Sequence, residues 1–229
     1  MYFMGIRGAF MDQHLFLFGG GPPFTAEMAE RFSDLCKEST APVAIVCVDQ
    51  GSWEQYMPSY TEALEKSDVR DFHFLPLPTT PVKKVVECLK ESSGIIICGG
   101  NTNLYADNIV ETIIADVIKE RFKQGIPVAG FSAGALISPD LCLLAPGEPG
   151  ESDIRVRKGL GLISNLLLSV HFSESNEESH LRNAVRQYPH YVNYGIDEDT
   201  CMYFKNGQLE EMEGKGVHTI ESGVLCRVF

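Results

Sequence analysis

Residues 126–136 read IPVAGFSAGAL. The run 126–130 predicts a buried strand, and the Gly-x-Ser-x-Gly pattern from Gly130 to Gly134 predicts a sharp turn from that strand into a short helix. Glycines two positions before and after Ser132 let the backbone turn and lift the hydroxyl clear, while the helix N-terminus favours developing negative charge. A tight turn without chemistry is the alternative, but the preceding strand favours a nucleophilic serine.

The segments around this turn alternate between strand-like and helical patterns. The predicted strands up to the turn are 15–18, 43–48, 72–75, 94–98 and 126–130. Such alternation predicts a parallel sheet with helices on both faces. Residues 166–172 predict another strand, and the tail 194–229 has turn residues typical of antiparallel hairpins. We expect an α/β fold with three α/β/α layers, a mostly parallel central sheet and a C-terminal β-hairpin addition.

Chain length sets the domain count. The chain has 229 residues, which suits one α/β domain over 1–229, because two full domains of half that size would each be small. The strand pattern begins only at Leu15. The sequence therefore leaves open that residues 1–13 are a disordered extension, and that Met4 or Met11 is the natural start.

Net charge and cysteine usage limit partners and location. The 19 Lys and Arg residues against 31 Asp and Glu residues give a formal charge of −12 at pH 7, which repels phosphate backbones and anionic lipids. We expect neither nucleic acid nor membrane as a partner. The seven scattered cysteines form no C-x-x-C pair, and no apolar run resembles a signal peptide or a membrane span. We therefore expect a cytoplasmic protein with reduced cysteines.

Two clusters could suggest a cofactor or a metal ion. The glycines at 19–21 are followed by two prolines that replace the G-x-G-x-x-G spacing, and no Walker lysine is present. Two histidines and three glutamates lie close together at His171, Glu174, Glu177, Glu178 and His180. They lack a recognised zinc spacing, so a solvated acidic helix start is the better interpretation. We expect no cofactor and no metal.

The histidines decide the mechanism, because a serine is a poor nucleophile near neutral pH without a base. His171 ends the apolar run 166–170, at the edge where parallel sheets place functional groups. We choose His171 as the base of Ser132, the alternative being a histidine satisfied within the core. His14, His73 and His190 lack a distinctive setting.

His218 is the alternative base. An α/β-hydrolase orders its triad as serine, acid and histidine, and Asp197 or Asp199 before His218 would satisfy that order. Nearby glycines indicate a hairpin instead, and the chain leaves no room for later βα units. An esterase using these residues stays an alternative, as does a binding module that kept the turn at Ser132 but lost activity.

The oxyanion of acyl transfer needs N–H donors, commonly one after the nucleophile and one from a neighbouring loop. Gly99-Gly100-Asn101-Thr102 follows the predicted strand 94–98 and could face the serine of the adjacent strand. We expect Gly100 and Ala133 to supply the oxyanion hole, with a plain strand-to-helix turn as the alternative for Gly100.

Five motifs carry a family resemblance. They are GFSAGA at 130–135, GGNT at 99–102, KGLGL at 158–162, VHF at 170–172 and GIDEDT at 195–200. With them the sequence resembles the dipeptidase E and cyanophycinase family of serine peptidases, whose fold is similar to that of the class I glutamine amidotransferases. The resemblance implies a triad containing Ser132 and His171, Gly100 near the oxyanion, and cytosolic cleavage of small peptides.

The resemblance also suggests that the triad acid is a carboxylate between the serine and the histidine. Glu148, Glu151 and Asp153 lie there, in a loop rich in proline and glycine. We choose Glu148, with Glu151 a close second. Such a carboxylate would fix the imidazole tautomer and stabilise the imidazolium.

One departure from the family concerns the substrate. Cyanophycinases resemble one another in carrying several arginines just after the His-Phe pair, whereas Ser175, Glu177 and His180 occupy the comparable positions here and only Arg182 lies nearby. Cyanophycin is therefore not the expected substrate. The sequence predicts a serine peptidase that cleaves small peptides through an acyl-enzyme, and it leaves the peptide specificity and the oligomeric state open.

Overall fold

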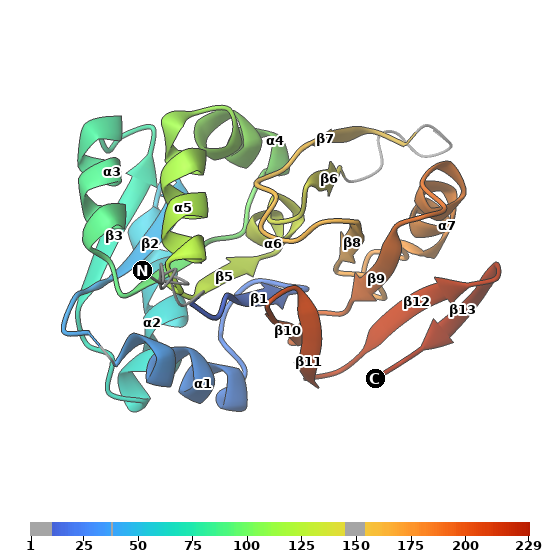
Figure 1. The fold of residues 1–229 in the computed structure, drawn as a ribbon, viewed down its shortest axis with the longest axis horizontal. Coiled ribbons are helices and arrows are strands. Elements are labelled where there is room, and N and C mark those ends of the chain that lie inside the picture. Colours follow the sequence, from blue (N-terminus) through green and yellow to red (C-terminus); the bar gives the residue numbers. More distant parts are fainter. Residues whose placement is uncertain (1–10, 38, 145–153) are drawn as a thin grey trace, which may run out of the picture.

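A seven-stranded central sheet organises the computed structural model, which describes residues 11–37, 39–144 and 154–229. The strand order is β11-β10-β1-β5-β4-β2-β3 (Figure 1). The strands are β1 His14–Phe18, β2 Val43–Val48, β3 Phe72–Leu77, β4 Gly94–Ile97, β5 Val128–Phe131, β10 Cys201–Lys205 and β11 Gln208–Glu213. Neighbours among β1 to β5 run parallel, and β10 runs antiparallel to β1 and β11. The mostly parallel central sheet is confirmed.

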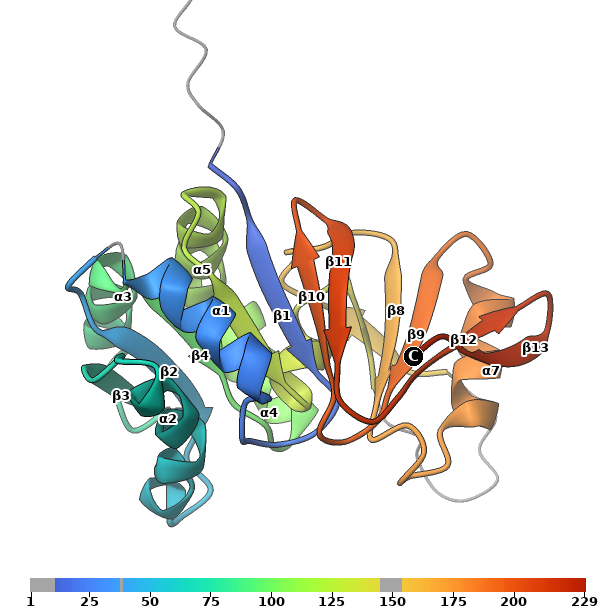
Figure 2. The ribbon, with the colours of Figure 1, turned by 90° about the horizontal axis from the view of Figure 1, so that it is seen from below.

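Helices cover both faces of this sheet, as the all-apolar strands β2 and β4 require. Helices α1 Ala26–Cys36 and α2 Met57–Lys66 lie on one face, and α3 Val82–Glu91 and α5 Ile113–Lys123 on the other (Figures 1 and 2). Shorter segments link the strands: η1 Trp53–Tyr56, α4 Thr102–Tyr105, η2 Ala106–Val110 and α6 Ala133–Leu136. In α1 the buried Met28, Phe32 and Cys36 recur at helical spacing and face the core.

A second sheet of four strands stands beside the central one, in the order β13-β12-β9-β8. Its strands are β8 Leu166–Val170, β9 Val192–Ile196, β12 Val217–Glu221 and β13 Val224–Arg227, with α7 Glu178–Gln187 between β8 and β9. Strands β6 Leu141–Leu143 and β7 Val156–Lys158 form a separate antiparallel pair. The tail forms the predicted antiparallel hairpins, which divide between sheets: β10–β11 extends the central sheet and β12–β13 the second.

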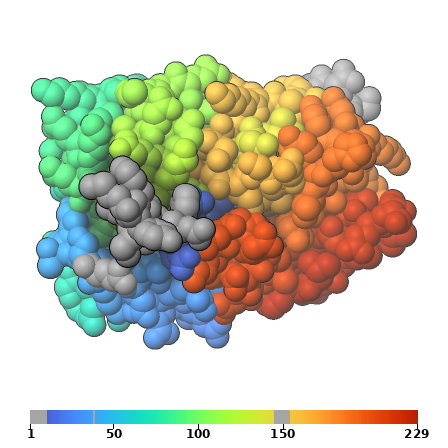
Figure 3. Space-filling view, viewed as in Figure 1, coloured from blue at the N-terminus to red at the C-terminus, as the bar shows by residue number. Residues whose placement is uncertain are grey.

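Aromatic packing fills the core between the central sheet and α1. The rings of Phe18 and Phe131 stack with centroids 4.1 Å apart, and Phe24 meets both edge-on. Figure 3, a space-filling view, shows the C-terminal part of the chain, coloured orange to red, lying directly against the rest of the molecule. Within the three described ranges, no helix combines the length and apolar character needed to cross a membrane.

Gly94 tests the contact between β4 and α1. A Cβ at this position would lie 2.6 Å from Cys36 Sγ and 2.9 Å from Phe32 Cζ. We expect Gly94→Ala to lower the free energy of unfolding by about 1–3 kcal/mol, the usual effect of overpacking a core. Gly21→Ala is the control, because nothing lies within 4 Å of its added Cβ. Equal urea midpoints for the two variants would contradict this packing.

Candidate active site

Ser132 occupies a strained turn between β5 and α6. Its backbone has φ 48° and ψ −106°, a conformation rare for a residue with a side chain. A Cβ on Gly130 would lie 2.5 Å from the Gly134 carbonyl oxygen, and one on Gly134 would lie 2.2 Å from the Ile97 carbonyl oxygen. Both glycines are therefore required by close backbone packing, and the turn presents the Ser132 hydroxyl beyond the end of β5.

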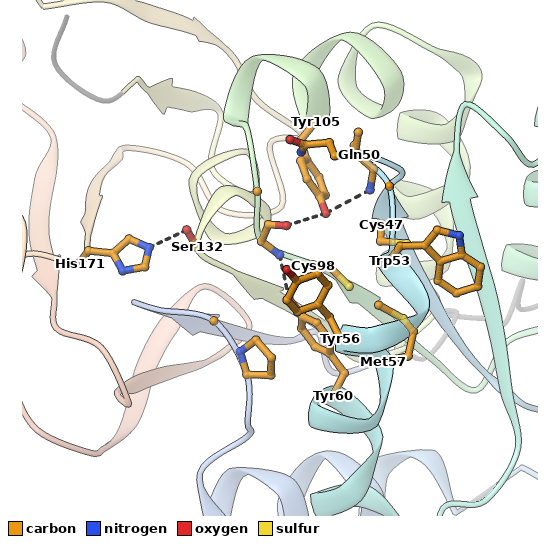
Figure 4. A pocket seen from close by; sticks show the side chains of 16 residues that line it. Cys47, Gln50, Trp53, Tyr56, Met57, Tyr60, Cys98, Tyr105, Ser132 and His171 are labelled. Atoms are coloured by element: carbon orange, nitrogen blue, oxygen red, sulfur yellow. Dashed lines mark hydrogen bonds between the residues drawn. The ribbon is translucent and has the colours of Figure 1, made fainter. Parts of the chain in front are cut away.

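His171 reaches Ser132 from the second sheet. It directly follows β8, with a positive φ of 49°. Its Nε2 lies 2.8 Å from Ser132 Oγ (Figure 4). The structure thus brings together the serine and the histidine that the sequence singled out, although they belong to different sheets.

Glu198 lies on the other side of the imidazole. Its Oε1 is 2.8 Å from His171 Nδ1, and its own backbone N–H donates to the Glu174 carboxylate. An ionised carboxylate only accepts hydrogen bonds, so it fixes the imidazole proton on Nδ1 and leaves Nε2 to accept the Ser132 hydroxyl proton. This is the order of groups in a serine hydrolase triad.

The carboxylate beside His171 is not one of those chosen from the sequence. Glu148, Glu151 and Asp153 all lie outside the described residues. The carboxylate on His171 Nδ1 is Glu198, which follows the histidine in the chain instead of preceding it. The GIDEDT motif at 195–200 was the available signal for this residue.

The end of β1 touches all three segments that carry these side chains. The Phe18 carbonyl accepts from the Ser132 N–H at 3.1 Å, and the Gly19 carbonyl accepts from the His171 N–H at 2.8 Å. The Gly19 N–H donates to the Thr200 carbonyl, two residues beyond Glu198, at 3.0 Å. One short stretch of backbone therefore fixes the relative positions of serine, histidine and glutamate.

Close approach explains the glycines after β1. A Cβ on Gly19 would lie 2.3 Å from the Asp197 carbonyl oxygen, and one on Gly20 would lie 3.2 Å from Glu198 Cα. The glycine run thus allows the turn that carries the acid to pack directly on β1.

The residues of the alternative triad, His218, Asp197 and Asp199, contact groups other than Ser132. His218 Nε2 lies 3.0 Å from Asp197 Oδ2, and its ring stacks on Phe172 with centroids 4.9 Å apart. Asp199 forms an ion pair with Lys215 at 2.7 Å. Asp197 also accepts from the Ser173 backbone N–H at 3.0 Å, so its carboxylate links the turn after His171 to the turn that carries Glu198.

The loop after β4 lies beside the serine. A Cβ on Gly99 would lie 3.3 Å from Ser132 Cβ, and Gly99 is held by hydrogen bonds with the hydroxyls of Tyr60 and Tyr105. Gly100 has φ +147°, which favours glycine, and its N–H has no partner among the described residues. Ala133, the first residue of α6, has no helical acceptor for its N–H. Among the described residues, neither of these two N–H groups has a hydrogen-bond partner.

Two cavities meet at Ser132 and His171. The larger, about 530 Å³, is lined by aromatic and small uncharged residues that include Trp53, Tyr56 and Tyr60 (Figure 4). The smaller, about 230 Å³, has leucine walls and a polar side formed by Ser169, Ser175, Glu177 and His180. A bound peptide can therefore place one group on each side of the serine.

The cysteine thiols near the site are not suited to act as nucleophiles. Burial raises the pKa of the Cys47 thiol to about 12 and also raises the pKa of the Cys98 thiol well above its usual value, so both stay protonated and are poor nucleophiles. Across the described part of the chain, no group of three or more His, Cys, Asp or Glu side chains could hold a metal ion.

Comparison with known proteins shows the family of this chain. The model of peptidase family S51 matches residues 15–212. The chain is 32% identical over 146 residues to a cyanophycinase from Geminocystis herdmanii, covering 62% of this chain and 53% of that protein. It is 30% identical over 89 residues to a peptidase E from Shewanella putrefaciens, covering 38% of this chain and 35% of that one. The chain thus spans about half the length, or less, of these curated relatives.

A solved structure shares the fold. A peptidase from an acI-B1 actinobacterium superimposes with a TM-score of 0.75 at 20% identity, covering 95% of this chain and 94% of that one. At this identity the likeness shows the arrangement of helices and strands alone.

Asp197→Asn tests the link between the two turns. Burial raises the pKa of Asp197, but hydrogen bonds from Ser173 and His218 outweigh burial and lower the pKa below 3.8. The charge therefore stabilises the fold above the unfolded-state pKa, and this stability is lost as the pH falls through the lower folded-state pKa. We expect the variant to lose about 1–2 kcal/mol of unfolding free energy at pH 7, measured in urea, with the difference shrinking as the pH falls below about 3.8.

The matched control for this variant is Asp199→Asn, which breaks the exposed ion pair with Lys215. We expect it to change stability by less than about 0.5 kcal/mol. Equal losses in the two variants, or a difference that does not depend on pH, would contradict the role of Asp197.

Proposed function

The chain belongs to peptidase family S51, and we propose that it is a serine peptidase that hydrolyses small peptides with Ser132, His171 and Glu198. The observation that carries this proposal is the continuous line of contacts from Ser132 Oγ through both nitrogens of His171 to Glu198, each 2.8 Å long. Distances of this length suit proton transfer.

Formation of the acyl-enzyme begins at the serine. As Ser132 Oγ attacks the peptide carbonyl carbon, its proton passes to His171 Nε2. The imidazole becomes positively charged, and the Glu198 carboxylate on Nδ1 stabilises that charge. The strained backbone of Ser132 holds the hydroxyl in the orientation for attack.

The oxyanion of the tetrahedral intermediate needs donors that are already in place. We assign this role to the backbone N–H groups of Gly100, which lines both cavities with Ser132, and of Ala133, which follows Ser132; neither has a partner among the described residues. The hydrogen bonds that hold Gly99 between Tyr60 and Tyr105 support it, because they immobilise the loop before substrate binds.

Collapse of the intermediate releases the amine product. His171 returns the proton from Nε2 to the leaving nitrogen, so the C–N bond breaks and an ester to Ser132 remains. A water molecule, deprotonated by the same nitrogen, then attacks the ester carbonyl. As the ester C–O bond breaks and the acid product leaves, His171 Nε2 returns that proton to Ser132 Oγ. Ser132 and His171 are thereby returned to their starting protonation states.

Small peptides are the substrate class that the site favours over cyanophycin. The cavities on both sides of Ser132 have volumes of about 530 and 230 Å³, of the order of small-molecule sites. No described arginine lines either cavity, and Arg182 pairs with Glu178 on α7. The free cysteines, most of them buried, suit the reducing cytoplasm, which is the location that we propose.

A fluorophosphonate probe tests the proposal without knowledge of the substrate. We expect the wild-type protein to be labelled at Ser132 and to hydrolyse members of a dipeptide library, and Ser132→Ala to lose both properties. Loss of a triad nucleophile costs on the order of 10⁶-fold in kcat. Turnover retained by Ser132→Ala after removal of contaminating hydrolases would refute the serine mechanism, and an unlabelled, inactive wild type would indicate a binding module.

A further inference from the structure

The two cavities beside Ser132 differ in charge. Among the described residues that line the larger cavity, none is Asp, Glu, Lys or Arg. The described residues that line the smaller cavity include one carboxylate, Glu177, among walls formed by Leu136, Leu143 and Leu168. A substrate that spans Ser132 therefore meets an uncharged environment on one side and an acidic one on the other.

Glu177 is under-bonded for a half-buried carboxylate. Its one side-chain hydrogen bond among the described residues is a long one, 3.4 Å from Ser169 Oγ to its Oε2, and it forms no ion pair there. A carboxylate can accept about four hydrogen bonds. Burial raises the pKa of Glu177, so the anion is held at a cost that a cation in the cavity would offset.

The neighbouring charged groups are already engaged. Glu178 pairs with Arg182, and Glu174 accepts from the Glu198 backbone N–H. His180 donates from Nε2 to the Leu144 carbonyl at 2.8 Å, and burial lowers its pKa, so it stays neutral near pH 7. Among the described residues that line the cavity, Glu177 is thus the one carboxylate and none is Lys or Arg, while Arg155 lies close enough for its charge to act on His180.

We propose that the smaller cavity is a subsite for a positively charged nitrogen group of the substrate, recognised by Glu177. The leucine walls suit the methylene groups of a lysine side chain, and the carboxylate suits its ammonium group. A free peptide amino group offers the same chemistry. This inference rests on the proposed peptidase function and adds the charge preference of the substrate.

Paired substrates test the subsite, because lysine and norleucine differ mainly in the ammonium group. We compare kcat/KM for Leu-Lys with Leu-norleucine and for Lys-Leu with norleucine-Leu, each with a free and an acetylated amino terminus. The wild type should prefer the cationic member of at least one comparison, lysine over norleucine or a free over an acetylated amino terminus, by about tenfold or more. Acetylation distinguishes the terminal amine from the side chain as the source of the charge.

The variant Glu177→Gln should lower the preference to about twofold or less, mainly by slowing the cationic substrates. Glu178→Gln is the matched control, because that glutamate is paired with Arg182 and should leave the ratio unchanged. The charge of Glu177 also acts on His171. The ratio of two substrates cancels this effect, whereas a single rate would not.

Failure of the subsite differs from failure of the peptidase proposal. Equal rates for cationic and neutral partners in a wild type that hydrolyses dipeptides, or a preference that survives in Glu177→Gln, would overturn the subsite and leave the serine mechanism standing. If no dipeptide is hydrolysed, the same peptides are compared as competitors of fluorophosphonate labelling at Ser132. Equal competition by cationic and neutral peptides would then overturn the subsite.

Discussion

The backbone at the end of β1 is the constraint on which the site depends. Ser132 belongs to the central sheet, whereas His171 and Glu198 follow strands of the second sheet, and Phe18 and Gly19 bond to all three segments. The contact requires glycine, because the Asp197 carbonyl passes where a Gly19 side chain would be. The same backbone contacts therefore join the two sheets and bring Ser132, His171 and Glu198 together.

The parts that follow from local pattern could be predicted from the sequence. The apolar runs at 43–48 and 94–98 each carry enough β-branched residues to specify buried strands, and the glycines around Ser132 specify the turn. His171 was accessible for a similar reason, because it ends an apolar run. These features depend on residues close together in the chain.

The parts that depend on distant contacts could not be predicted in the same way. The sequence predicts a strand at 166–172 but not the sheet that it joins. In the structure β10, from the tail, takes the free edge of β1, and β8 pairs with β9. For the same reason, the sequence did not single out Glu198. Glu198 reaches His171 because the turn after β9 packs on Gly19 and Gly20, and chain order alone does not reveal that distance.

The central claim of this account is that Glu198 holds His171 in the tautomer that activates Ser132, and the rate of fluorophosphonate labelling measures that activation directly. Glu198→Gln keeps the shape of the side chain but permits the wrong imidazole tautomer. The analogous change of Asp to Asn in a well-studied triad lowers kcat about 10⁴-fold. The account predicts labelling slowed by at least about 100-fold in Glu198→Gln, and by no more than a few-fold in Asp199→Asn, whose carboxylate pairs with Lys215. Equal labelling rates for the two variants would contradict it.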